Sequence, residues 1–245
     1  MIDKAVAVLD ALLPAREGLT PTEVAAVTAT NRSTAFRLLT SLEHAGLLNR
    51  DAESGRYRLG IKLLRYGGAV RASMEIVKIA EPALLQLRDE MRQTTLLAMR
   101  EGWGARCLLR LPGPEVDVLS WATGEWLPLH IGGATQALMG ALNDDEIDRY
   151  LTTNADWHTR DGDRTASDIR ERVTGIRKRG WALNQEEVTR GVASLGVVIP
   201  VDTDAEAQYA ISVAGLAHHY TGADLERTAA RVQETALAIS RQLRA

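Results

Sequence analysis

The sequence predicts a two-domain protein with a small N-terminal winged helix-turn-helix unit, a linker helix and a larger C-terminal α+β domain. Three observations support this prediction. A chain of 245 residues with 45% hydrophobic residues can bury one core in each of two domains. Its first quarter shows helical periodicity followed by one hairpin, whereas the rest alternates strand-like and helix-like runs. Basic residues gather between Asn31 and Tyr66, where the net charge is about +4, although the whole chain carries −3.

Two helices are expected at the start of the chain. Apolar residues recur at helical spacing from Ile2 to Leu13 and end before a proline, which predicts an amphipathic helix. Thr20, Pro21 and Glu23 then supply a capping threonine, a first-turn proline and a glutamate three residues after the cap. We expect a short second helix from this point.

A third helix is predicted to begin after a cap at Thr30 or Asn31 and to end at Gly46. Two short helices joined this tightly form a helix-turn-helix. The exposed N-terminal face of the third helix would carry groups that reach phosphates or base edges in the major groove of DNA. These candidate DNA contacts are Asn31, Arg32, Ser33, Thr34, Phe36 and Arg37.

A β-hairpin should follow the third helix, with its turn at residues 51–55. Arg56 and Arg58 lie on the second strand and are two further candidate DNA contacts, which makes the hairpin a candidate wing beside the recognition helix. A small helical cap domain, or a module that binds another protein, would fit the same pattern. Affinity for duplex DNA that falls steeply with salt would distinguish a DNA-binding unit from these alternatives.

The linker is predicted to be mostly helical, with a bend at Gly67 and Gly68. We expect a DNA-binding domain over residues 1–67, a linker helix over 68–92 and the second domain over 93–245. In that domain TGEWLP is expected to be a turn leading to His130, and Thr221 should cap a long closing helix. Other helices are expected over 132–142, 144–151 and 166–179. The expected strands are TTLLAMRE, ARCLLRL, VDVLSWA, WALN, GVVIPV and QYAISVAGL.

Several segments carry a resemblance to a known family. RSTAFRLLTSLEHAGLL, LPLHIGGATQALMGAL and RGWALNQEEVTRGVASLGVVIPV together resemble the IclR family of bacterial transcriptional regulators, over nearly the whole chain. The resemblance implies a winged-helix head, a profilin- or GAF-like effector domain, and dimers that often pair into tetramers. It also implies a repressor of catabolic genes that binds palindromic operator DNA and a small organic acid or related metabolite.

The resemblance also implies an effector site. Backbone amides at the helix start after LPLH could hold a carboxylate. Two positions depart from the family pattern: Gln136 replaces a common lysine, and an amide, Asn184, replaces a frequent acidic residue. The site residues implied are Gly133, Ala134, Asn184, Ser194 and Ser212.

Two other classes of protein are weighed against a regulator. An enzyme would have Cys107, His130 and Glu186 as nominal nucleophile, base and acid, but no known catalytic spacing connects them. A metal sensor would depend on His130, His158 and the neighbours His218 and His219. The last two are expected in an extended stretch, where neighbouring side chains point to opposite sides and cannot easily share one ion.

No cofactor and no metal is expected. A single cysteine fits a reducing compartment, and the N-terminus does not resemble a secretion signal, so we expect a cytoplasmic protein. No apolar run approaches the roughly 18 residues that cross a bilayer, so no membrane contact is expected.

Overall fold

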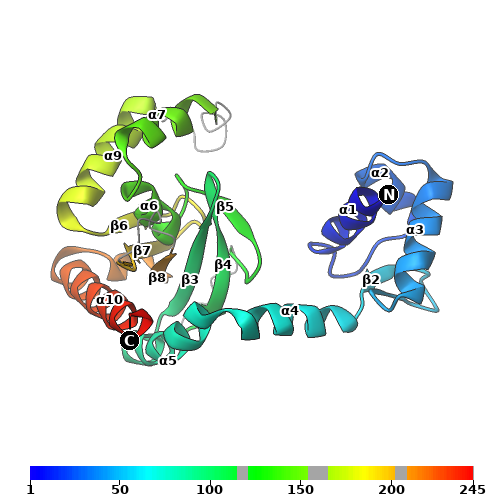
Figure 1. Cartoon of the computed structure of the whole chain (residues 1–245), viewed down its shortest axis with the longest axis horizontal. Helices are drawn as coiled ribbons and strands as arrows, with labels where there is room; N and C mark the ends of the chain where they lie inside the picture. The colour runs from blue at the N-terminus through cyan, green and yellow to red at the C-terminus, as the bar shows by residue number, and fades with distance from the viewer. Residues whose placement is uncertain (115–120, 154–164, 202–208, 245) are drawn as a thin grey trace. The chain divides into compact units, whose positions relative to one another are not determined.

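The computed structural model describes residues 1–114, 121–153, 165–201 and 209–244. These form two compact units, Met1–Ser73 and Met74–Ala245, which are drawn together in Figure 1. The first unit extends a few residues beyond the predicted head. Each unit has its own hydrophobic core.

The first unit is a winged helix-turn-helix. Val8, Leu39 and Tyr57 are fully buried in its core, so α1, α3 and the hairpin all pack on one another. The hairpin pairs Leu48 with Leu59 in antiparallel register. Its elements are α1 (Ile2–Leu12), α2 (Pro21–Val27), α3 (Arg32–His44), β1 (Leu48–Arg50), β2 (Tyr57–Leu59) and α4 (Lys62–Ser73).

Local capping fixes where the two central helices begin. Thr20 and Glu23 form a capping box at α2, in which the Thr20 amide donates to Glu23 Oε2 at 2.7 Å. Asn31 caps α3, because its Oδ1 accepts the Thr34 amide at 2.8 Å. These bonds satisfy amides that a helix start leaves without partners.

The predicted bend at Gly67 and Gly68 is wrong. Both glycines lie inside α4, and the helical run breaks instead at Met74, whose backbone is extended before α5 (Glu75–Met91). Glycine only weakens a helix, by about 1 kcal/mol relative to alanine, and the neighbouring leucines, arginines and alanines are good helix formers. The pair therefore does not interrupt the helix.

The second unit is an antiparallel sheet between two layers of helices (Figure 1). Its strand order is β5-β4-β3-β8-β7-β6, and α5 and α10 cover one face while α6, α7 and α9 cover the other. This is the predicted α+β domain. Its remaining elements are β3 (Thr94–Glu101), β4 (Gly104–Leu111), β5 (Trp126–Pro128), α6 (Gly133–Gly140), α7 (Asp144–Thr153), α9 (Ala166–Arg179), β6 (Ala182–Gln185), β7 (Val192–Val198), β8 (Tyr209–Leu216), η1 (Ala217–His219) and α10 (Gly222–Leu243).

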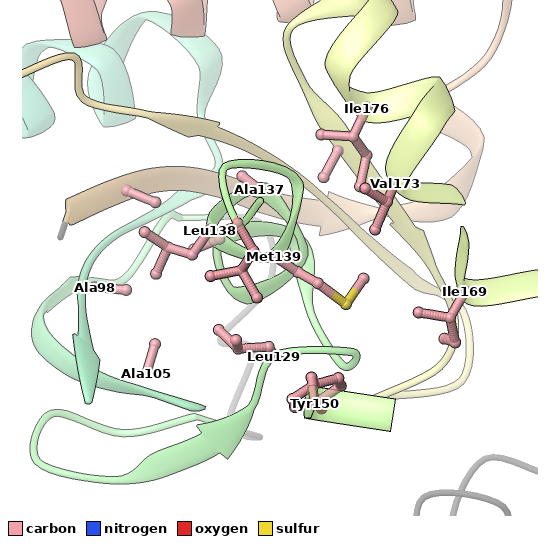
Figure 2. Packing of buried hydrophobic residues seen from close by; sticks show 14 of the residues in the cluster. Ala98, Ala105, Leu129, Ala137, Leu138, Met139, Tyr150, Ile169, Val173 and Ile176 are labelled. Atoms are coloured by element: carbon pink, nitrogen blue, oxygen red, sulfur yellow. The ribbon is translucent and has the colours of Figure 1, made fainter. Parts of the chain in front are cut away.

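The core on the α6 side positions the start of that helix. Leu138 and Met139 of α6 are fully buried, and they lie between Tyr150 of α7 and Ile176 of α9 (Figure 2). All eight residues of α6 are buried. A helix enclosed this completely holds its N-terminus in a fixed place against the sheet.

Two strands of the second domain differ from their predictions. The strand expected at GVVIPV, residues 196–201, is β7, which begins four residues earlier and ends at Val198. The expected turn TGEWLP contains the short strand β5, which pairs with β4. The reason is that Gly104 has no side chain: a Cβ there would lie 2.1 Å from the Trp126 ring, so this glycine allows the tryptophan to pack over β4. The predicted strand VDVLSWA falls mainly on residues 115–120, outside the described residues.

Candidate functional site

The N-terminal end of α3 presents an exposed polar and basic surface. Arg32 and Arg37 are exposed, and Phe36 exposes 50% of its surface. Asn31 and Ser33 are exposed too, but Asn31 Oδ1 is occupied by the cap and by the Ser33 hydroxyl at 2.9 Å. Ala35, Leu38, Leu39 and Leu42 form the buried side of the same helix, so the free face is the one predicted to contact DNA.

Arg56 does not lie free on the wing. Its guanidinium donates to both carboxylate oxygens of Glu23, at 3.0 and 3.2 Å, and to the Gly18 carbonyl at 2.8 Å. A paired, half-buried arginine is a structural tie between the hairpin and the start of α2. Arg58 remains exposed on the wing, where its guanidinium lies 3.5 Å from the Glu17 carboxylate.

Glu23 is the centre of this tie. Hydrogen bonds from the Thr20 amide and hydroxyl, followed by the Arg56 guanidinium, hold the pKa of the Glu23 carboxyl below its usual range. The charged form is therefore favoured at neutral pH, where it caps α2 and binds Arg56 of the hairpin.

In the second unit, α6 begins directly on β7. A Cβ on Gly133 would lie 2.8 Å from the Ser194 carbonyl oxygen, and a Cβ on Gly196 would lie 2.2 Å from the Gly133 carbonyl oxygen. Only glycine allows backbones to approach this closely. The Gly133 amide donates to Ser194 Oγ at 3.0 Å, so this amide already has a partner and is not available to hold a carboxylate in this structure.

A cavity lies beside this contact. It encloses about 480 Å³, a volume that includes the solvent at its opening. Four of the five predicted effector residues line it, namely Gly133, Asn184, Ser194 and Ser212. Ala134 does not, because its side chain is buried in the core. The other lining residues are Leu96, Trp121, Leu127, Gly132, Val188, Thr189, Val192 and Ala214.

Sheet register explains why the polar residues meet. Asn184 on β6 lies opposite Ser194 on β7, and Gly196, two residues on, lies opposite Ser212 on β8. Residues two apart on a strand share a face, so the three polar side chains lie together on the α6 side of the sheet. Distant sequence segments thus form one polar floor.

Glu187 is a residue of this region that the sequence did not single out. Only 8% of its side chain is exposed, and it accepts hydrogen bonds from Arg172 Nη1 at 2.6 Å, from Gln136 Nε2 at 2.7 Å and from Asn184 Nδ2. In the sequence, Glu187 stands beside Glu186 within RGWALNQEEVTRGVASLGVVIPV, one of the segments that carry the family resemblance. No local spacing shows that helices α6 and α9 both reach this carboxylate.

The groups proposed for an enzyme are used locally. Cys107 is buried, and burial raises the pKa of its thiol to about 12. A thiolate nucleophile is therefore not available near neutral pH. His130 Nδ1 lies 2.5 Å from Tyr150 Oη, and Glu186 accepts the Gly191 amide at 2.7 Å.

The expected extended conformation of the paired histidines was wrong. His218 and His219 lie in the 3₁₀ turn η1 and not in an extended stretch, and their ring centroids are 4.1 Å apart. Within the described residues, however, no three histidine, cysteine or acidic side chains gather as metal ligands would. His158 lies outside the described residues.

Comparison with known families decides the identity. The model "Bacterial transcriptional regulator IclR C-terminal" matches residues 68–241, and the model "IclR helix-turn-helix domain" matches residues 1–52. The chain belongs to the IclR family of transcriptional regulators. This confirms the predicted DNA-binding regulator with a winged helix-turn-helix and an α+β domain. Both models describe transcriptional regulators and not enzymes.

Individual relatives agree with the family assignment. The regulator KipR of Bacillus subtilis is 28% identical over 98% of this chain and 95% of its own length. The transcriptional repressor IclR of Escherichia coli is 25% identical over 79% of this chain and 72% of its own. An IclR homologue from Microbacterium hydrocarbonoxydans, solved with 4-hydroxybenzoate, has the same fold, with a TM-score of 0.80 and 20% identity over 99% and 98% of the two chains. Among the described residues of this IclR-family chain, no helix is long and apolar enough to span a membrane.

Proposed function

We propose that this IclR-family chain is a cytoplasmic, ligand-controlled repressor of catabolic genes. It binds palindromic operator DNA as a homodimer or a dimer of dimers. A small organic acid or related metabolite in the cavity of the second unit changes that affinity. The observation that carries this proposal is that one chain combines an exposed basic recognition helix with a cavity lined by buried hydroxyl and amide groups.

The proposed DNA contacts are divided between bases and phosphates. Arg37 and Phe36 extend from the exposed face of α3, where an arginine can bind guanine and an aromatic ring can contact a thymine methyl. Asn31, Arg32, Ser33 and Thr34 surround the helix start, which suits a phosphate. Arg58 on the wing would bind the neighbouring backbone, while Arg56 holds the wing in place through Glu23.

Exposed apolar residues on the first unit support the homodimer. No residue of α4 is buried, yet Leu64 is 73% exposed and Val70 is 56% exposed. On α1, Ile2 and Val6 are exposed about one turn apart, whereas Val8 and Leu12 of the same helix are buried. Exposed apolar residues that gather on one surface mark interfaces in soluble proteins. A second copy of the same unit would cover them and place two recognition helices on a two-fold operator.

Repression fits the named function of the Escherichia coli relative, and a small organic ligand fits the molecule in the Microbacterium structure. The cavity is lined by four of the five residues proposed to bind the effector, and Ala134 would support it from the core. A ligand that binds one arrangement of the dimer more tightly shifts operator affinity by a coupling of typically 1–3 kcal/mol.

Selection of bound fragments from random duplex DNA tests the operator. We expect a palindrome whose affinity falls with salt at a logarithmic slope of about −4, since Arg32 and Arg58 of two heads would neutralise about four phosphates. Arg32→Gln should lower that slope by about 2, one phosphate per head, whereas Arg241→Gln on the exposed end of α10 should not. No enriched sequence at low salt would refute the proposal and favour a protein-binding head.

A substitution in the cavity tests the effector site. Ser212→Leu places an apolar side chain where a 2%-exposed hydroxyl lines the cavity, and it should abolish ligand response while operator affinity stays within about twofold. Ser167→Leu, the same change on the exposed surface of α9, is the control. Ligand response that survives Ser212→Leu would show that the effector binds elsewhere.

A further inference from the structure

The hydrogen-bonding character of the cavity is set by a carboxylate behind its wall. Glu187 follows β6 and is not itself a lining residue, but it accepts hydrogen bonds on both oxygens. Its Oε1 is bound by Arg172, and its Oε2 is bound by Gln136 and Asn184. Donors from α9, α6 and β6 therefore meet at one buried anion.

This arrangement fixes which end of the Asn184 amide faces the ligand. A carboxylate only accepts hydrogen bonds, so the Nδ2 of Asn184 must face Glu187. The other end of the amide, Oδ1, is left for the cavity that Asn184 lines. Asn184 is only 2% exposed, and no group in the described part of the chain donates to its Oδ1. The cavity thus has a buried acceptor at this end.

The other end of the polar floor has the opposite character. Ser212 is 2% exposed, lines the cavity, and its hydroxyl has no hydrogen-bond partner among the described residues. Ser194 uses its oxygen to accept the Gly133 amide, so its own hydrogen can be donated toward the ligand. Hydroxyl donors therefore follow the Asn184 acceptor across the face of the sheet.

Charge does not replace these hydrogen bonds. None of the described lining residues is charged, and half of them are aliphatic or aromatic. Arg172 is the cation bound to Glu187, which leaves the pair internally compensated. Recognition in such a site depends on placing a donor opposite an acceptor, because a buried polar group without a partner loses its hydration without compensation.

We propose that Glu187 is a positioning residue that fixes the polarity of the cavity, that is, which of its groups accept hydrogen bonds and which donate them. The effector is then a small molecule that donates a hydrogen bond to Asn184 Oδ1 and accepts one from Ser212, as a hydroxy-substituted carboxylic acid or its amide does. This inference rests on the proposed function, since it assumes that the effector binds in this cavity.

The test compares similar ligands with and without a hydroxyl donor. Two sets are titrated calorimetrically into the full-length protein: lactate, propanoate and pyruvate, and para-hydroxybenzoate, benzoate and para-methoxybenzoate. Within at least one set, the hydroxylated member should bind about 10- to 100-fold more tightly than the member without a donor. Ser212→Leu should abolish that binding, which places it in the cavity.

Glu187→Gln then tests the positioning role. With Arg172 holding the new amide oxygen, its Nε2 would face Asn184, whose Oδ1 would turn toward it and whose Nδ2 would turn into the cavity. The preference should invert, so that pyruvate or the methoxy acid binds more tightly than the hydroxy acid. The control is Glu186→Gln, a neighbouring carboxylate whose bond is to the Gly191 amide, and it should keep the original preference.

The outcomes separate the two proposals. Cavity binding with equal affinity for donor and donor-free ligands would overturn the polarity and leave the effector site standing. An unchanged preference in Glu187→Gln would overturn the role of Glu187. Binding by no member of either set would count against the effector site itself, and the proposed polarity of the cavity would be refuted as well.

Discussion

The close contact between α6 and β7 allows a sharp prediction for Gly196→Ala. The added Cβ would lie 2.2 Å from the Gly133 carbonyl oxygen, 2.3 Å from the Gly133 carbonyl carbon and 2.6 Å from the Ala134 amide nitrogen. Carbon atoms pack best at about 3.5–4.0 Å, so the two backbones must separate by about 1 Å. All three atoms belong to the main chain, and no side-chain rotation can relieve the overlap.

The expected cost is large because α6 cannot move freely. Overpacking a core costs about 1–3 kcal/mol, and separation would also stretch the bond between the Gly133 amide and Ser194 Oγ, worth about 1 kcal/mol. We expect the free energy of unfolding to fall by about 3 kcal/mol, as measured by urea unfolding followed by circular dichroism. Ligand affinity should fall as well, because the displaced residues line the cavity.

Gly175→Ala is the matched control. Gly175 lies within α9, and the nearest atom to a Cβ there would be Arg179 Nη1 at 3.6 Å, an ordinary contact. This variant should be more stable than the wild type by about 0.5–1 kcal/mol, since alanine is the better helix former. If Gly196→Ala changed stability by less than about 0.5 kcal/mol, the inferred rigid contact between α6 and β7 would be refuted.

Three further predictions concern single residues. Asn31→Ala should lower the stability of the first unit by about 1 kcal/mol in urea unfolding, because the Thr34 amide loses its cap. Cys107 should resist alkylation at pH 8 in the native protein and react rapidly in denaturant, and rapid native labelling would contradict its burial. The pKa of Glu23 is lowered by folding, so its contribution to stability is present at neutral pH and is lost as pH falls below about 4.5. Melting temperatures of wild type and Glu23→Gln should therefore converge in acid.

Local patterns predicted the helices and strands with clear ends. The helix predicted over 166–179 has the bounds of α9, which in the structure is capped by Thr165 and ended by Gly180 in a left-handed conformation. The strand TTLLAMRE likewise has the bounds of β3. Capping and strand alternation act within a few residues, so the sequence displays them directly.

Local patterns failed where a distant contact decides the conformation. The strand β5 exists because Trp126 packs over Gly104, which lies more than twenty residues earlier in the chain. Arg56 was predicted to contact DNA from its charge and hairpin position, yet Glu23 binds it. A charged residue in a sequence shows its chemistry but not its partner.

The sequence by itself determined the two-domain order, the recognition helix, the family and four of the residues that line the cavity. Those properties depend on periodicity, capping and motif spacing, which are written along the chain. Only the tertiary structure decided that Gly133 packs against Ser194 and Gly196, and that Glu187 receives Gln136, Asn184 and Arg172. The physical reason is that sheet register and helix packing bring these groups together, and the direction of a hydrogen bond can be assigned only when both partners are in place.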